Sequence, residues 1–325
     1  MQATAPLASL RCLVIVGLSL FAFSPSPVQA TQLTLPPETS STLEKIYSFD
    51  LDGAREAARQ LQKEHPDHPI GFLLESDVLW WHFWCTAAEF KYGMSDARRR
   101  SKIPADQRYL ELAATASSLA SAQIQRSETA EMHLYAGMAD AAAARLYALR
   151  GENRNTARFG VRARDHFLRA KTLDPSMADA DFGLGLYNYY VDTLSAMARI
   201  LRFFMGIPGG SKQEGIRLLD HAIAGGMLTS DVARFYLAMN LHRYDQRYEH
   251  AMNTISPLAE RFPSNPLFQL ARGDLYAKLG RKQKALLCYR AAAALPVRDS
   301  ECQARIHLLV RAAITSLGLP PGATP

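Results

Sequence analysis

The stretch GDLYAKLGRKQKALLCYRAAAALP, residues 273–296, carries the spacing that decides the fold. Its small, aromatic and helix-ending residues fall at fixed positions: Gly273, Tyr276, Gly280, Ala285, Tyr289, Ala292 and Pro296. Small residues one helical turn apart let two helices pack at close range, aromatic rings fill the space beside them, and proline ends a helix. The stretch therefore predicts a pair of helices joined by a turn at Gly280.

The alanine and proline of the second helix recur upstream. Ala251 lies 34 residues before Ala285. Three predicted second helices have an alanine with a proline twelve residues after it: Ala251 and Pro263, Ala163 and Pro175, Ala54 and Pro66. The pattern and its period resemble those of tetratricopeptide repeats. The resemblance covers most of residues 41–294, is clearest in 232–265 and 266–298, and implies an all-α, right-handed solenoid of helix pairs.

The predicted domain spans 41–317 and holds about six helix pairs, with a C-terminal helix that caps the last pair. Ser41 and Glu44 have the spacing of a capping box and predict the start of the first helix, and Ser127 predicts the N-cap of a later one. The buried face of the final helix is predicted from its apolar spacing: Cys302, Ile306, Leu309, Ala313 and Leu317. Three inserted loops interrupt the series: 90–105, 150–156 and 191–213.

Two segments near the third loop carry a narrower resemblance. They read GLYNYY at 185–190 and LRFFMGIPGG at 201–210. Together they resemble a group of exported bacterial tetratricopeptide proteins without an assigned activity. This resemblance bears on architecture and export and does not name a ligand.

The N-terminus has the features of a secretory leader. Arg11 precedes an apolar run at 13–23, and the residues before position 31 end in Val28-Gln29-Ala30, which fits cleavage after Ala30. The run is about half the ~20 residues that a membrane span needs. We expect a signal peptide at 1–30, a linker at 31–40 and a disordered tail at 318–325. The mature protein is then periplasmic or outer-membrane associated, with no transmembrane segment.

Export places the remaining cysteines, Cys85, Cys288 and Cys302, in an oxidising compartment. Their odd number and wide spacing do not form a disulfide framework. Cys288 and Cys302 fall on successive predicted helices and are one candidate pair. Buried free thiols that pack as small apolar groups are the favoured interpretation.

The charge balance is mild. The chain carries 37 basic and 31 acidic side chains, a formal net charge of +6. Basic residues do not alternate with stacking aromatic residues, so nucleic acid is not an expected partner. The run Arg98, Arg99, Arg100 with Lys102 lies in an inserted loop, and a solvated loop is the default interpretation. Its functional interpretation is a peripheral contact with an acidic partner or an anionic envelope surface.

The histidines and the glycine-rich segments of the sequence do not form a catalytic or metal-binding pattern. His65 and His68 sit in a proline-rich turn without a third ligand at a recognisable spacing. Residues 206–212 lack the residue order of a phosphate loop, although the helix N-terminus at Ser211 and Lys212 has N–H groups that suit an anion. We expect no enzymatic activity, no metal and no cofactor.

All three tryptophans lie in the stretch WWHFW at 80–84. Adjacent side chains on a helix cannot share one face, so these rings point in different directions. Core packing is the favoured interpretation for most of them. An exposed ring would instead mark an aromatic binding surface.

The inner face of the first helix in each pair is where tetratricopeptide arrays hold extended peptides. The repeat register predicts these residues on or near that face: Tyr189, Tyr190, Tyr236, Asn240, Arg243, Tyr244, Asp274 and Lys278. Arg202, from the third inserted loop, joins the predicted site. Tyrosine and arginine suit recognition because they provide flat apolar area and strong hydrogen-bond donors.

We therefore expect a protein or peptide partner in the cell envelope, bound in the concave groove of an interaction or scaffolding module. The alternative is a lipid or small-ligand protein in which the insertion at 191–213 lines a cavity. Leu194, Met197, Leu201 and Met205 are spaced for one face of an amphipathic helix. Whether this helix covers the groove or thickens the core stays open.

Overall fold

The computed structural model describes residues 2, 33–87, 101–194, 202 and 206–318. Every regular element in these residues is helical: α1 (Thr39–Tyr47), α2 (Leu51–Glu64), α3 (Ile70–Ala87), α4 (Pro104–Arg126), α5 (Ala130–Leu149), α6 (Asn153–Leu173), α7 (Ala178–Asp192), α9 (Lys212–Gly225), α10 (Ser230–Asn240), the π-helical turn η2 (Leu241–Asp245), α11 (Tyr248–Arg261), α12 (Pro266–Lys278), α13 (Lys282–Ala294) and α14 (Ser300–Ser316). None of the described helices is long and apolar enough to cross a membrane.

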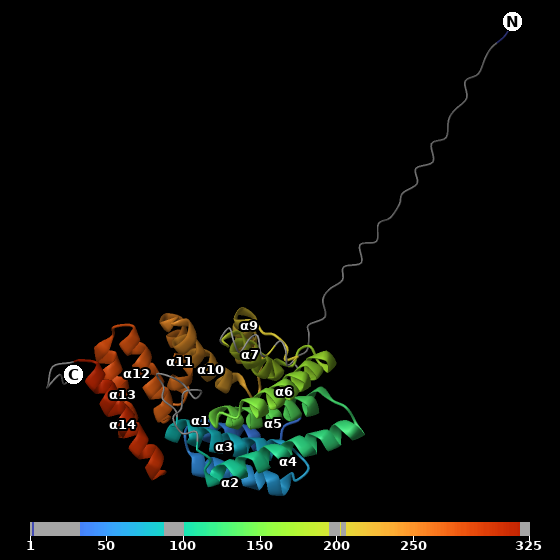
Figure 1. Cartoon of the computed structure of the whole chain (residues 1–325), viewed down its shortest axis with the longest axis horizontal. Coiled ribbons are helices and arrows are strands. Elements are labelled where there is room, and N and C mark those ends of the chain that lie inside the picture. Colours follow the sequence, from blue (N-terminus) through green and yellow to red (C-terminus); the bar gives the residue numbers. More distant parts are fainter. Residues whose placement is uncertain (1, 3–32, 88–100, 195–201, 203–205, 319–325) are drawn as a thin grey trace.

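Consecutive helices pack as pairs, with α1 on α2, α3 on α4, α5 on α6, α7 on α9, α10 on α11 and α12 on α13. The last helix, α14, packs on α13. Figure 1 shows the pairs following one another from blue to red along the sequence. The fold of the described residues is therefore an all-α, tetratricopeptide-like solenoid of six pairs with a final helix, as predicted.

The small residues of the repeat pattern lie where helices approach most closely. Ala54, Ala251 and Ala285 are fully buried. A Cβ atom added to Gly273 of α12 would lie 2.5 Å from the ring of Tyr289 on α13, so only glycine leaves room for that ring. The predicted register of the second helices is confirmed by this packing.

Glycines in the left-handed conformation end two of the first helices. Gly151 has φ 74° and Gly280 has φ 72°. In each case the next residue donates its N–H back across the turn, Glu152 to the Tyr147 carbonyl and Arg281 to the Tyr276 carbonyl. This arrangement closes a helix end within a few residues. The inserted loop expected at 150–156 is wrong for this reason, because α6 already begins at Asn153.

Two predicted helix starts are also corrected. The first helix begins at Thr39 after Glu38, whose side chain forms no cap, so the Ser41–Glu44 capping box is wrong. Ser127 ends α4, and Thr129 is the N-cap of α5, with its side chain accepting from the Met132 N–H. Hydroxyl residues two positions apart offer similar caps, and the spacing in sequence did not separate them.

Parts of the two longer insertions, 90–100 in one and 195–201 and 203–205 in the other, lie outside the described residues. For the insertion at 90–105, the description resumes at Ser101, and α4 begins at Pro104. For the insertion at 191–213, the described part after Gly206 leads into α9. There Gly185 of α7 and Gly215 of α9 bring the two helix backbones into direct contact, since a Cβ on Gly215 would lie 2.8 Å from the Gly185 carbonyl oxygen.

The solenoid is closed by α3, which is buried over most of its surface and carries all three tryptophans. Trp81 packs against Phe235 of α10 and Phe268 of α12, with ring centroids 5.0 and 5.6 Å apart. Trp80 and Trp84 are buried beside it. Core packing of the tryptophans is thereby confirmed. Helices α2 and α4 pack on other sides of α3, and the C-terminal pairs cover the side that carries Trp81.

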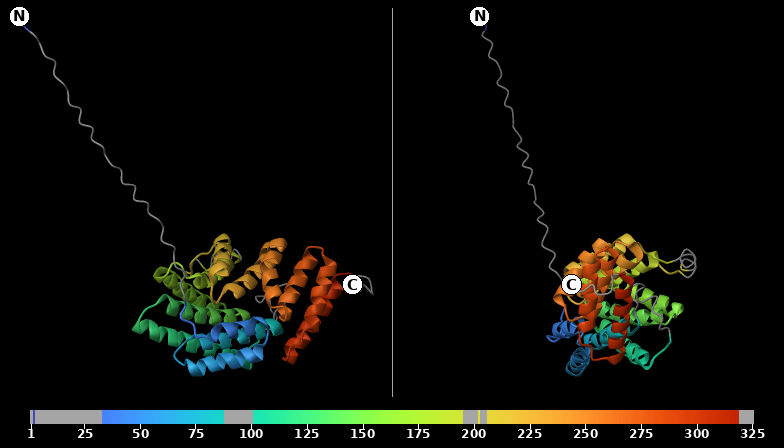
Figure 2. Two further views of the ribbon diagram at one scale, coloured as in Figure 1. Left: turned by 180° about the vertical axis from the view of Figure 1, so that it is seen from behind. Right: turned by 90° about the vertical axis from the view of Figure 1, so that its left-hand side faces the viewer.

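The C-terminal end of α1 also contacts the C-terminal half of the chain, at the turn between α11 and α12. The Asn265 amide donates to the Tyr47 carbonyl over 2.9 Å, and the Ser264 hydroxyl donates to the Ser48 carbonyl over 2.8 Å. Arg261 pairs with Glu44 at 2.9 Å. Figures 1 and 2 show the blue and cyan N-terminal helices lying alongside the orange and red C-terminal ones.

A disulfide joins the two halves. Cys85 at the end of α3 is bonded to Cys302 at the start of α14, with Cα atoms 5.3 Å apart, and Cys288 is free and buried. The expectation of three free thiols is wrong, and so is the candidate pair Cys288 and Cys302. The bonded cysteines are 217 residues apart in sequence, and only the closure by α3 brings them together.

The close helix crossings predict the effect of enlarging their alanines. Ala251→Leu or Ala285→Leu should overpack a pair and lower the free energy of unfolding by about 1 to 3 kcal/mol. Ala291→Leu makes the same change at an exposed position of α13 and is the matched control. Urea unfolding followed by circular dichroism measures the difference, and equal stability of all three variants would contradict the register.

Because the disulfide joins the two halves of the chain, we expect it to contribute strongly to the free energy of unfolding. Replacing Cys85 and Cys302 together by Ser should lower the free energy of unfolding by about 2 to 4 kcal/mol, because the bond restricts the unfolded chain across a long loop. Non-reducing peptide mapping should find peptides 85 and 302 linked, with Cys288 alkylated only after unfolding. Alkylation of Cys85 in the native oxidised protein would contradict the disulfide between Cys85 and Cys302.

Candidate functional site

The inner face predicted to hold a partner is partly occupied by the protein itself. Tyr236 of α10 accepts a hydrogen bond of 2.7 Å from the indole N–H of Trp80 on α3. Tyr236, Asn240 and Tyr189 have exposed fractions of 6%, 2% and 0%. The sequence predicted these three side chains on an open groove, whereas the structure buries them. Their burial follows from the closure by α3, which has no counterpart in an open array.

Three tyrosines remain together beside this covered face, and we call Tyr189, Tyr190 and Tyr244 the tyrosine cluster. The ring of Tyr244, in η2, lies 5.9 Å from that of Tyr189 and 6.3 Å from that of Tyr190. Tyr189 and Tyr190 meet edge to face at 6.0 Å. Tyr190 and Tyr244 are half-buried. Edge-to-face contacts of this kind fix the rings in place.

A π-helical turn positions the third tyrosine. η2 continues α10 with wider backbone spacing and ends at Gln246, which has φ 54°. π-helical turns are rare, and they occur frequently at functional sites. This turn directs Asp245 toward α7 and α9. Its carboxylate accepts from the hydroxyl of Tyr189 on α7 at 3.0 Å and from Nζ of Lys212 on α9 at 2.6 Å. The cluster is therefore held between two neighbouring helix pairs, α7–α9 and α10–α11.

Hydrogen bonds beneath the cluster fix the tyrosine hydroxyls. Tyr190 donates to the Asn240 side-chain oxygen, and Tyr189 also donates to the Asn240 carbonyl, both over 3.1 Å. Burial raises the pKa of Tyr189 and Tyr190, and Asp245 raises that of Tyr189 further. Both phenols therefore stay protonated and act as donors at neutral pH.

Cations lie over the rings of the cluster. Arg243 Cζ is 4.6 Å from the centre of the Tyr244 ring, and Lys212 Nζ is 5.4 Å from that of Tyr189. Arg243 is half-buried. The charge of Lys212 is balanced by Asp245, so the accessible surface consists of the Tyr190 and Tyr244 rings with Arg243 beside them. Such a surface is attractive to a partner that carries carboxylates or aromatic groups.

The remaining predicted residues lie elsewhere. Asp274 accepts a 2.7 Å hydrogen bond from the Tyr289 hydroxyl, within the α12–α13 pair. Lys278 is exposed, with its Nζ 5.9 Å from the ring of Tyr248. Arg202 donates to the Ile207 carbonyl over 3.0 Å. The structure brings together Tyr189, Tyr190, Asn240, Arg243 and Tyr244, but not these three.

A second candidate surface is a cavity of about 470 Å³ between α6, α7 and α9, which was not predicted from the sequence. Its lining combines leucines with charged groups of both signs: Arg164, Leu168, Lys171, Asp181, Leu184, Glu214, Arg217, Leu218 and His221. These residues come from three helices, so no local motif announces them. The volume is in the range of small-ligand sites.

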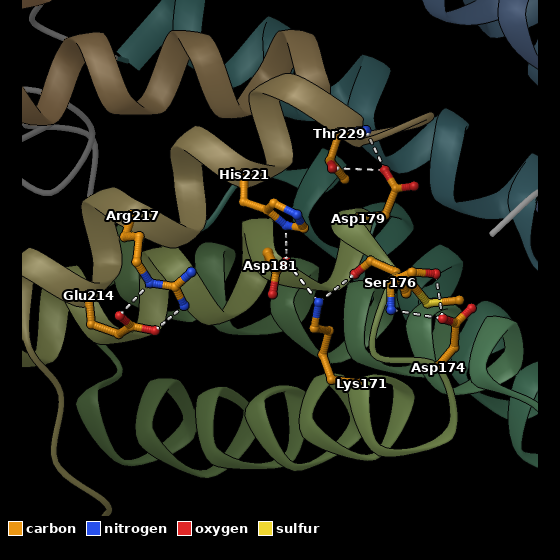
Figure 3. A network of polar contacts seen from close by, with 10 residues as sticks. Lys171, Asp174, Ser176, Asp179, Asp181, Glu214, Arg217, His221 and Thr229 are labelled. Carbon is orange, nitrogen blue, oxygen red and sulfur yellow. Dashed lines mark hydrogen bonds and ion pairs between the residues drawn. The ribbon is translucent and has the colours of Figure 1, made fainter. Parts of the chain in front are cut away.

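Most charged groups of the cavity are paired with one another, as Figure 3 shows, and Arg164 pairs with Asp165 at 3.3 Å. The buried carboxylate of Asp181 accepts from Lys171 Nζ at 3.0 Å and from His221 Nδ1. Glu214 and Arg217 form a two-bond pair on α9. Mutual pairing leaves little net charge to attract a ligand, so the cavity is weaker as a binding site than the tyrosine cluster.

Other predicted features have structural roles. The α9 N-terminus is satisfied from within, because Asp192 accepts the Lys212 N–H at 2.9 Å and Ser211 caps the helix. His68 Nδ1 accepts from the Ile70 N–H in the turn before α3. Residues 98–100 of the basic run lie outside the described part.

One described group of potential metal ligands includes a predicted turn histidine. The ligand atoms of Glu38, Glu64 and His65 lie within 4.8 Å of one another. Both glutamates are exposed. Exposed acidic groups of this kind are ordinary solvated side chains, so this cluster does not form a candidate site.

Comparison with known proteins finds structures with a similar fold but does not identify a function. No family model matches the chain, and no curated protein matches it. Among solved structures it is similar to YrrB, described as a tetratricopeptide-repeat protein with an unusual peptide-binding site, at 16% identity and a TM-score of 0.34 over 80% of this chain and 99% of that one. It is also similar to yeast Tom70, at 11% identity and a TM-score of 0.31 over 87% and 90%. These likenesses are too weak to carry a functional argument.

His242, which lies next to the tyrosine cluster, should make the stability of the protein depend on pH. Burial, with a smaller contribution from Lys278, lowers the pKa of His242 from 6.5 to about 4. Between these values the unfolded chain binds a proton that the folded chain does not, so stability is lost as the pH falls from about 6.5 to 4, by on the order of 3 kcal/mol. Thermal melts from pH 7 to 4 should show a shallower decline for His242→Phe. Parallel declines would mean that His242 does not titrate in this way.

Proposed function

We propose that this protein is an exported, non-enzymatic binding module whose protein or peptide partner docks on the tyrosine cluster. The observation that carries the proposal is the π-helical turn η2, which brings Tyr244, Arg243 and Asp245 to the end of α7. A continuous α-helix would give better backbone hydrogen bonds, so the turn costs stability. Its benefit is the arrangement of side chains that it presents.

The cluster has the composition and support of a recognition surface. Tyr190, Tyr244 and Arg243 are half-buried and so combine a fixed position with accessible surface. Beneath them, Tyr189 and Asn240 are buried and hydrogen-bonded. Pre-organised aromatic and arginine side chains lose little freedom on binding, which is the reason such residues contribute most to interface affinity.

Export is supported by two separate features. The first is the apolar leader that ends at Ala30. The second is the disulfide between Cys85 and Cys302, because such bonds persist in oxidising compartments. The proposed location is the periplasm or the outer-membrane surface.

The lipid-binding alternative depends on the apolar insertion at 191–213. Most of its large apolar side chains lie outside the described residues, and Leu194 at its start is exposed. The contacts of the described residues favour the protein partner, because the cluster is polar and bordered by cations. The experiment below distinguishes the two ligands by their mass.

The test is site-specific photo-crosslinking in the native host. A benzophenone amino acid replaces Tyr244, and in a matched control it replaces Tyr276, a half-buried tyrosine of α12 outside the cluster. We expect a protein adduct of defined mass at position 244 that weakens when Arg243→Ala is added, and none at 276. The same adducts at both positions, or a lipid adduct at 244, would overturn the proposal.

A further inference from the structure

Helix α6 concentrates the positive charge of the protein. Its 21 residues contain six basic side chains and one acidic side chain, Asp165, for a formal charge of +5 in a chain of net charge +6. The basic residues are Arg154, Arg158, Arg162, Arg164, Arg169 and Lys171. The pairing of α6 with α5 does not by itself require so many cations on one helix.

Four of these arginines form one stripe. At 100° per residue, Arg154, Arg158, Arg162 and Arg169 fall within an arc of about 80°, and at 1.5 Å per residue they extend over about 22 Å. All four are exposed. The opposite side of the helix is buried through Ala163, Phe167 and Ala170. We call these four residues the arginine stripe.

The stripe is held in place at one end and free at the other. Arg162 pairs with Asp140 at 3.0 Å, and Arg169 pairs with Glu128 at 2.7 Å. Arg154 and Arg158 form no ion pair among the described residues. The first two turns of α6 therefore present uncompensated charge to solvent.

The position of Arg154 opposes the stability of the helix. It lies in the first turn of α6, which has no acidic residue, and the preceding Glu152 provides no side-chain cap. A helix N-terminus carries partial positive charge, so a cation there is unfavourable and an anion is favourable. The anionic Glu152 at this end pairs with Lys102 at 3.0 Å, so these two charges balance each other. The charges of Arg154 and Arg158 on the first two turns stay unbalanced and suit an external anion.

Aromatic rings lie beside two arginines of the stripe. Arg158 Cζ and Arg162 Cζ lie 4.9 and 5.1 Å from the ring of Phe159, which stacks on Tyr147 with centroids 5.4 Å apart. Phe159 and Tyr147 are half-buried. Arginines and aromatic rings side by side are typical of groups that lie at a membrane–water interface.

We infer that the arginine stripe docks on the phosphate headgroups of an anionic lipid bilayer. Arginine binds phosphate oxygens with two parallel hydrogen bonds, and a straight, exposed stripe matches a flat surface. An acidic protein would need an apolar centre to its interface, and the stripe provides none beyond the two half-buried rings. This inference is independent of the tyrosine cluster.

The experiment measures co-sedimentation of the protein, as processed by its host, with vesicles. Phosphatidylglycerol mixed with phosphatidylcholine is compared with phosphatidylcholine alone, at low and high salt. Arg154→Gln with Arg158→Gln removes two stripe charges. Arg298→Gln with Arg311→Gln removes two exposed charges near and within α14, so both variants have the same net charge.

We expect binding to the anionic vesicles only, lost at high salt. The stripe variant should partition about 30-fold more weakly, from about 1 kcal/mol per arginine, while the control variant binds like the native protein. Circular dichroism should show equal helicity in all three. Equal weakening in both variants, equal binding to neutral vesicles, or capture by soluble polyglutamate with no vesicle binding would overturn the inference.

Discussion

The burial of α3 is the interaction on which the other features depend. An array of helix pairs normally leaves the inner face of its first helices to solvent or to a ligand, and each pair contacts only its neighbours. Here a helix with three tryptophans is buried over most of its surface, and each such ring removes on the order of 150–250 Å² of surface from water. Helices α10 and α12 cover Trp81 through Phe235 and Phe268. The closed shape, the hydrogen bonds of α1 and the disulfide all follow from this contact.

The closure also decides which part of the inner face remains available. Side chains that point from α10 toward α3, such as Tyr236, become part of the core. The tyrosine cluster lies at the C-terminal ends of α7 and α10, and there the chain departs from regular helix geometry in η2. A recognition surface at this place is small and stiff, because its rings are supported by buried hydrogen bonds to Asn240 and Asp245. Selectivity would then come from side-chain geometry rather than from a long groove.

Much of the architecture was predictable from sequence, because the contacts within a helix pair are local. The spacing of Gly273, Ala285 and Tyr289 reports directly on one crossing, and repeats of the second-helix signature mark four of the six pairs. The closure was not predictable, because Cys85 and Cys302 are 217 residues apart and no pattern links them. The same limit, that contacts between distant residues leave no local pattern, applies to the candidate site. The register correctly grouped Tyr189, Tyr190 and Tyr244, and it could not show that Tyr189 would be buried.

The contacts between α1 and the α11–α12 turn change how the chain folds. In an open array, stability is nearly a sum over neighbouring repeats, so terminal pairs can fray independently. Here Tyr47 and Asn265 are hydrogen-bonded although 218 residues separate them, so the first pair gains its partners only after most of the chain has been made and ordered. Contacts of such long sequence separation slow folding, and they convert a one-dimensional series of repeats into a ring that unfolds as a unit.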